Sequence, residues 1–275
     1  MIEPVKGVAP QRARVVTAPN PGVLTLTGTN TWVLSEPEAD GCIVVDPGPD
    51  DETHIDAVLA EVERLASSVE LILITHRHAD HTGATDALQA RTGAPVRAMD
   101  PAWCRGTVPL VDREEMEVAG LRLHVVATPG HTDDSVSFHL PRDGALLTGD
   151  TILGEGSSLI AWPDGRLGPY LESMQRLRDI AAAGLSLTLL PGHGPLVLWG
   201  LDAIDTLIAH RVRRLEQVTG ALDRGASTVS EVVAAVYGLP GPALHDVVIA
   251  QVRAQLDHLA ATGNARAADA LTRAG

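Results

Sequence analysis

The segment Leu71-Ile72-Leu73-Ile74-Thr75-His76-Arg77-His78-Ala79-Asp80-His81 joins a run of aliphatic residues to a cluster of metal-ligand side chains. The aliphatic run predicts a strand that is buried on both faces. His76 and His78 are two residues apart, so both can point the same way as the chain leaves the strand. Asp80 and His81 fall on the turn into the next predicted helix. Imidazole and carboxylate groups are zinc ligands, so the segment predicts a metal site at a strand end.

Three later turns repeat this arrangement, because each follows a predicted strand and carries one ligand-type residue. They are Thr128-Pro129-Gly130-His131-Thr132, Thr148-Gly149-Asp150-Thr151 and Pro191-Gly192-His193-Gly194. A glycine in each turn lets the backbone approach a ligand closely. Taken alone, each turn is a weak signal. Together they supply enough ligands to complete two metal shells: His131, Asp150 and His193.

Two further residues have two interpretations each. Asp46 ends a predicted strand and precedes Pro47, so it is either a turn former or a carboxylate that orients a ligating histidine. Tyr170 opens the helix after the Asp150 turn, and it either lines the substrate cleft or packs at the helix start. The remaining histidines lack partners at metal spacing and are expected to be structural or exposed: His54, His124, His139, His210, His245 and His258.

The rest of the pattern alternates strands with helices and predicts an α/β layered sandwich. Expected strands cover 23–26, 31–34, 42–45, 71–74, 96–99, 114–118, 121–126, 135–140, 145–147 and 187–190. Expected helices cover 54–65, 84–91 and 169–183, with Asp51 or Thr53 as the cap of the first. After residue 200 only helices are expected, at 202–224, 228–237 and 244–262, before an alanine-rich tail. The predicted domains are therefore 1–205 and 206–275.

The composition fits a globular protein with an aliphatic core. Of the 275 residues, 45% are apolar and only 3% are aromatic. The net charge of −14 disfavours tight binding of duplex nucleic acid. Cys42 and Cys104 form no CxxC pair, which excludes a cysteine-type zinc site and fits a reducing cytoplasm. No apolar run approaches the roughly 18 residues of a membrane span, and the N-terminus lacks a signal-peptide core. A cytoplasmic protein without a membrane partner is expected.

The order of these motifs resembles the metallo-β-lactamase superfamily over about residues 20–200. The resemblance implies a four-layer αββα sandwich with two divalent metal ions at one edge, zinc being the expected ion. It implies that one ion is held by His76, His78 and His131. The second would be held by Asp80, His81 and His193, with Asp150 bridging both ions.

A closer resemblance is to the β-lactamase-like protein 2 subfamily, which includes glyoxalase-II-like hydrolases. It is carried by Asn20-Pro21-Gly22 with 25–31, by Gly130-His131-Thr132-Asp133-Asp134-Ser135 and by residues 149–156. The segment 206–275 resembles the winged-helix appendage of that group. The subfamily includes a metal-dependent endoribonuclease that acts on single strands. Position 135 is Ser here, where ribonuclease-type members are expected to have His.

The expected function is a dinuclear hydrolase in which a metal-bridging hydroxide attacks a small ester, thioester or lactone. Asp80 would orient the nucleophile and accept its proton. A GxSxG motif is absent, so no serine nucleophile is expected. The alternatives are cleavage of single-stranded RNA, and a C-terminal domain that binds a partner, binds nucleic acid or forms a lid or dimer contact. Arg77 and Arg166 are among the arginines expected near the metals.

Overall fold

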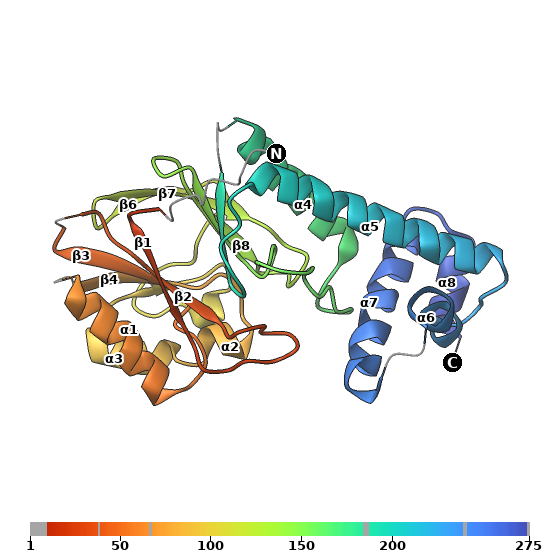
Figure 1. Cartoon of the computed structure of the whole chain (residues 1–275), viewed down its shortest axis with the longest axis horizontal. Coiled ribbons are helices and arrows are strands. Elements are labelled where there is room, and N and C mark those ends of the chain that lie inside the picture. Colours follow the sequence, from red (N-terminus) through yellow and green to blue (C-terminus); the bar gives the residue numbers. More distant parts are fainter. Residues whose placement is uncertain (1–9, 38, 66–67, 184–186, 239–240, 274–275) are drawn as a thin grey trace, which may run out of the picture. The chain divides into compact units, whose positions relative to one another are not determined.

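The computed structural model describes residues 10–37, 39–65, 68–183, 187–238 and 241–273 (Figure 1). Residues 1–9, which form part of the N-terminal segment expected to lack a signal-peptide core, lie outside the described residues. The chain divides into two compact units. Unit 1 comprises Met1–Thr128, Asp134–Gly156 and Ile180–Leu201, and unit 2 comprises Pro129–Asp133, Ser157–Asp179 and Asp202–Gly275. The two units are defined by contacts in space, and each combines segments that are separate in the sequence. The domain boundary at residue 205 therefore stays a prediction.

The first sheet has the strand order β1-β2-β3-β4-β5. β1 and β2 pair antiparallel, as do β2 and β3, whereas β3, β4 and β5 run parallel. The parallel strands are joined by helical crossovers, as parallel pairing requires. The strands are β1 (Ala13–Thr17), β2 (Asn30–Leu34), β3 (Gly41–Val45), β4 (Ser68–Leu73) and β5 (Val96–Arg97).

The second sheet has the order β10-β9-β8-β7-β6. Its first four strands in sequence form an antiparallel meander, and β10 joins β9 in parallel. As a result β7, β9 and β10 all end at one edge. The strands are β6 (Glu115–Val118), β7 (Leu121–Ala127), β8 (Val136–Leu140), β9 (Ala145–Gly149) and β10 (Thr188–Pro191).

Two aliphatic cores hold unit 1 together. One lies between the two sheets and contains Leu34, Ile43 and Leu73 with Phe138 and Leu147. The other lies between the first sheet and its helices, α1 (Glu52–Arg64) and α3 (Thr85–Thr92), which cover the outer face of that sheet (Figure 1). Cys42 is fully buried in this second core, as an inert thiol should be. The helices form as the sequence predicts: the Asp51 carboxylate accepts from the Thr53 and His54 amides, and Gly93 ends α3 at φ 73°.

The predicted strand at 23–26 is wrong. Only a single bridge joins Gly22 to Leu26, and the chain turns between them, with Val23 71% exposed and Leu24 51% exposed. The Thr25 hydroxyl donates to the Asn20 carbonyl at 2.6 Å, and Leu26 has a positive φ of 54°. A β-branched, aliphatic run therefore forms a closed loop because local hydrogen bonds replace strand pairing.

The remaining helices are α2 (Ala79–Thr82), a 3₁₀ turn η1 (Pro101–Trp103), α4 (Leu167–Ala183), α5 (Gly200–Asp223), α6 (Val229–Tyr237), α7 (Pro242–Ala261) and α8 (Ala265–Thr272). The alanine-rich tail thus contains α8, a helix that was not predicted from the sequence although Asn264 caps it. The described residues after Gly200 include four helices and no strand, so the predicted winged-helix domain is not confirmed. Among the described residues, no helix is long and apolar enough to cross a membrane.

Candidate metal centre

The topology brings the ends of several strands to one edge of unit 1. Asp46 and Thr75 follow the parallel strands β3 and β4, and Asp150 and His193 follow the parallel strands β9 and β10. Backbone hydrogen bonds connect these ends: the Val136 amide donates to Thr75 at 2.9 Å, and the Gly192 amide donates to Gly149 at 2.9 Å. Ligand-type side chains far apart in sequence therefore meet.

Three groups of these side chains could each hold a metal ion. They are His76, His78 and His131; His76, His81 and Asp150; and Asp80, His81 and His193. In each group the ligand-type atoms lie within 4.8 Å of one another. All seven residues that the sequence singles out as metal ligands belong to these groups. His131 lies in the five-residue segment 129–133. At the base of this segment the Thr128 amide donates to the Ser135 carbonyl at 2.8 Å.

Two carboxylates lie close to the histidines of the third group. His193 Nε2 lies 3.2 Å from Asp80 Oδ2 and 3.3 Å from Asp150 Oδ2, and His81 Nε2 lies 3.4 Å from Asp80 Oδ2 and 3.4 Å from Asp150 Oδ1. The two Nε2 atoms are 3.3 Å apart. Only glycine fits at position 192, because a Cβ there would lie 2.5 Å from Asp150 Oδ1.

Hydrogen bonds on the far side of the rings fix which nitrogen carries the proton. His193 Nδ1 faces the Gly28 carbonyl at 3.2 Å, and His131 Nδ1 faces the Leu159 carbonyl at 2.8 Å. A carbonyl can only accept, so both Nδ1 atoms carry hydrogen, and each of these rings, when it is neutral, has its lone pair on Nε2. His81 Nδ1 likewise faces the Asp46 carboxylate at 2.8 Å.

Thr75 sets His76 in the same way. Its hydroxyl donates to Asp46 Oδ2 at 2.7 Å, so it accepts from His76 Nδ1 at 3.0 Å and leaves the lone pair of His76 on Nε2. That atom lies 3.1 Å from His78 Nδ1. Metal-binding histidines commonly donate their other N–H to a carboxylate or carbonyl, and four of these rings do so directly or through Thr75.

Asp46 organises the back of the site. Its carboxylate accepts from the Thr75 amide at 2.7 Å, from the Thr75 hydroxyl and from His81. Asp46 is 1% exposed and adopts a positive φ of 55°, which is a strained conformation for a residue with a side chain. Of its two sequence interpretations, this geometry favours the carboxylate that orients a histidine.

The pKa values of the clustered aspartates and of His193 are shifted by their charged neighbours. Burial raises the pKa of Asp80, but the hydrogen bond from His193 and the charge of His81 outweigh it and lower that pKa to about 2. Burial lowers the pKa of His193, yet its bonds to Asp150 and Asp80 raise it to about 10. The pKa of Asp150 is likewise held well below its ordinary value against burial by His81 and His193. Asp80 and Asp150 are thus held anionic by the positive charge of His81 and His193.

The donor set fits a divalent cation. In each group the imidazole nitrogens and carboxylate oxygens lie within 4.8 Å of one another, and both are ligand types that bind divalent cations. Imidazole and carboxylate, without thiolate, suit zinc and also other first-row metals.

A loop and a tyrosine complete the surroundings. The Thr29 hydroxyl donates to Asp80 Oδ2 at 3.1 Å. The Asn20 side chain donates to the Thr29 hydroxyl at 3.0 Å and accepts from the Thr29 backbone amide at 2.9 Å. Thr29 and Thr75 were not singled out from the sequence, because their hydroxyls carry no spacing signal. Tyr170 is fully buried, which fits its packing interpretation and gives the substrate-binding one no support.

The other histidines do not join these groups. Of the six, His54 is buried and bonds the Thr31 hydroxyl at 2.7 Å, and the rings of His124 and His139 meet edge-to-face across β7 and β8 with centroids 5.6 Å apart. These contacts fit the expected structural role for these three histidines.

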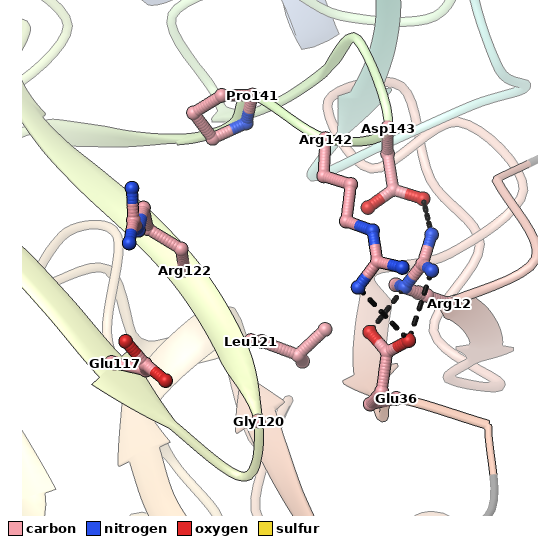
Figure 2. A pocket seen from close by; sticks show the side chains of 9 residues that line it. All are labelled: Arg12, Glu36, Glu117, Gly120, Leu121, Arg122, Pro141, Arg142 and Asp143. Carbon is pink, nitrogen blue, oxygen red and sulfur yellow. Dashed lines mark hydrogen bonds and ion pairs between the residues drawn. The ribbon is translucent and has the colours of Figure 1, made fainter.

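A cavity of about 300 Å³ lies at the opposite ends of the strands (Figure 2). The guanidinium groups of Arg12 and Arg142 both face the Glu36 carboxylate, and Arg12 also bonds Asp143 at 3.0 Å (Figure 2). These charges neutralise one another. The cavity is separate from the metal groups, because Glu36 follows β2 and Leu121 begins β7, at the ends remote from Asp46 and Thr128.

Comparison with known proteins identifies the class. Residues 24–193 match the metallo-beta-lactamase superfamily, and the chain belongs to this superfamily, whose members are generally hydrolases. The chain is 33% identical over 229 residues to the beta-lactamase-like protein 2 homolog of Caenorhabditis elegans, covering 80% of this chain and 74% of that protein. This confirms the subfamily resemblance.

Two further proteins are similar over most of the chain. An atrochrysone carboxyl ACP thioesterase of Claviceps purpurea is 30% identical over 243 residues, covering 85% of this chain and 74% of that one. A solved metallo-beta-lactamase family protein of Thermus thermophilus superposes with a TM-score of 0.76 at 25% identity, covering 92% of this chain and 94% of the other.

Proposed function

We propose that the protein is a dinuclear metal-dependent hydrolase acting on a small thioester, ester or lactone. The observation that carries this is the pair of ligand groups, one made of three histidines and one made of Asp80, His81 and His193, with Asp150 beside both. In this proposal His76, His78 and His131 would hold one ion, Asp80, His81 and His193 would hold the other, and Asp150 would be a ligand of both. Zinc is the proposed ion.

Two divalent ions bound here would lower the pKa of water and neutralise charge that develops on oxygen. The residues supply the rest. The Asp80 carboxylate is 27% exposed against 11% for Asp150, so Asp80 is the one placed to face a substrate and orient a nucleophile. The low pKa of Asp80 keeps it anionic at neutral pH. The hydrogen bond from Thr29 fixes its rotamer.

An acyl thioester is the substrate class we favour. The loop 20–28 is tied to the site at Gly28, which accepts from His193, and its exposed residues Val23 and Leu24 offer an apolar surface for an acyl group. The similarity to a fungal thioesterase points to the same chemistry.

Cleavage of single-stranded RNA is the second candidate, supported by the subfamily of the nematode relative. A strand-binding cleft needs arginines that are free to contact phosphate. Arg77 is ion-paired with Asp134 at 3.2 Å, and Arg166 is ion-paired with Asp257 at 3.1 Å. Both arginines therefore already have a carboxylate partner and are less available to phosphate. The small substrate is therefore the primary proposal.

Initial rates on an acyl thioester and on single-stranded RNA, measured against salt on one metal-loaded preparation, separate the two candidates. We expect thioester turnover with little salt dependence, and RNA cleavage that is slow and suppressed by salt. Fast, salt-tolerant RNA cleavage without thioester turnover would reverse the ranking.

A further inference from the structure

Arg211, on α5, is a buried cation that the proposed chemistry does not use. Its side chain is 2% exposed, although a guanidinium is rarely buried without a carboxylate partner. Within the described part of the chain Arg211 forms no ion pair, and its Nε has no hydrogen-bond partner. Such burial is costly, so the contacts that Arg211 does make indicate why an arginine stands there.

Those contacts are two. One Nη atom donates to the Ser158 carbonyl. The guanidinium carbon lies 5.0 Å above the centre of the Tyr170 ring, in a cation–π arrangement. Both partners are themselves buried, Ser158 at 1% and Tyr170 at 0% exposure.

Both contacted residues support His131. Leu159, next to Ser158, accepts from His131 Nδ1 at 2.8 Å, and the Ser158 hydroxyl lies 3.3 Å from the same atom. Tyr170 packs against the residue that precedes His131, because a Cβ on Gly130 would be 2.3 Å from the Tyr170 Cα. Arg211 thus contacts the segment that bonds His131 Nδ1 and the residue against which Gly130 packs.

We propose that Arg211 is a positioning residue for the metal centre: it fixes residues 158–159 and Tyr170, and thereby the ring orientation and the Nδ1–H tautomer of His131. This inference rests on the proposed role of His131 as a ligand. With Nδ1–H held by the Leu159 carbonyl, His131 presents the lone pair of Nε2 before any ion binds. An apolar side chain at 211 would leave residues 158–159 free to shift and the tautomer free to exchange.

The test compares Arg211→Met with the matched control Arg214→Met in the full chain. Arg214 is also on α5 and also covers a tyrosine, with its guanidinium carbon 4.6 Å from the Tyr237 ring, and it bonds Gln217 rather than His131 or the supports of that ring. Cobalt titration of metal-free protein measures the affinity of each site, and nitrogen-15 NMR of the imidazoles reports the tautomer of His131, assigned with His131→Ala.

For Arg211→Met we expect a 10- to 100-fold loss of affinity for one ion, the usual effect of removing a group that orients a ligand. The affinity for the second ion should be unchanged, and His131 should populate both tautomers. Metal-free Arg211→Met should melt no lower than the parent, since an unpaired buried charge has been removed. Arg214→Met should keep both affinities and the tautomer.

Unchanged affinities or an unchanged tautomer in Arg211→Met would overturn the proposal, as would an equal loss in Arg214→Met. If Arg211→Met does not fold, Arg211→Lys, which keeps the cation but not the planar fork, should show a smaller loss of the same kind. A folded Arg211→Lys with normal affinities and tautomer would then show that Arg211 serves folding alone. If His131→Ala itself binds two ions normally, the proposed ligand set fails instead.

Discussion

Hydrogen bonds to the Nδ1 atoms of the candidate histidines determine which ring nitrogen could bind a metal ion. Asp46 receives three of them, two from Thr75 and one from His81, and it keeps a positive φ of 55° to do so. The residues that could hold a metal ion were predictable because histidine and aspartate were spaced at strand ends. The role of Asp46 was only one of two interpretations, since turn formers and orienting carboxylates look alike in sequence.

Asp46→Asn tests this arrangement. Asparagine tolerates a positive φ, so the backbone should be retained. However, its amide group must turn a donor toward Thr75 or His81, which are themselves donors there. We expect metal affinity, measured by competition with a chelator, to fall 10- to 100-fold, and activity to fall with it. Asp51→Asn at the cap of α1 is the control and should leave both unchanged; equal behaviour of the two variants would show that Asp46 is only a turn former.

His54 gives a pH-dependent contribution to stability. Burial lowers its pKa below the ordinary value near 6.5. Below that pH the unfolded chain binds a proton that the folded chain does not, so the free energy of unfolding falls as the pH drops through about 6.5. Above it the effect is absent. The slope from one such group is at most about 1.4 kcal/mol per pH unit.

Denaturant unfolding of the parent and of His54→Gln from pH 7.5 to 5.5 measures this contribution. The difference between the two curves isolates His54 from other titrating groups. The variant should lose stability less steeply on acidification. Parallel curves would mean that His54 is protonated in the folded protein as well.

Among the secondary-structure elements, strand direction explains why the site forms. β3 and β4 run parallel, and β7, β9 and β10 end at one edge, so residues that follow these strands converge. Hydrophobic patterning predicted most strands and helices to within a few residues. It failed at 23–26, where loop hydrogen bonds outweigh β propensity, and no expected strand covered β1. It also missed α8, because alanine gives no amphipathic contrast beyond the Asn264 cap.

The loop 20–28 should contribute to substrate binding. Val23→Ser combined with Leu24→Ser removes its exposed apolar surface without touching Asn20 or Thr25, which close the loop. We expect the KM for a long-chain acyl thioester to rise about tenfold, the effect of losing roughly 50 Å² of apolar contact, with kcat unchanged. An acetyl thioester should be unaffected.

Val15→Ser is the matched control, because Val15 is 48% exposed but lies in β1. It should leave both KM values unchanged. If the loop variant also leaves the long-chain KM unchanged, the apolar surface of the loop does not contact the acyl group.

For the molecule as a whole, charge and architecture constrain the function. A net charge of −14 and ion-paired arginines disfavour a polyanionic substrate. The order of the motifs in the sequence was enough to predict the superfamily and its two sheets. The winged-helix assignment did not, because helical periodicity fixes helices but gives no signal for how they and a wing assemble.

The proposed activity depends on two metal ions, and elemental analysis of the purified full chain is the decisive measurement. The metal content is determined before chelation, after chelation and after metal is restored, and hydrolysis of an acyl thioester is followed on the same samples. We expect close to two divalent ions per chain, loss of hydrolysis on chelation and recovery on reloading. Asp150→Ala should be inactive but folded, because it removes the residue proposed as a ligand of both ions. A chain that carries no divalent ion, and hydrolyses the substrate equally well in the presence of chelator, would contradict the proposal.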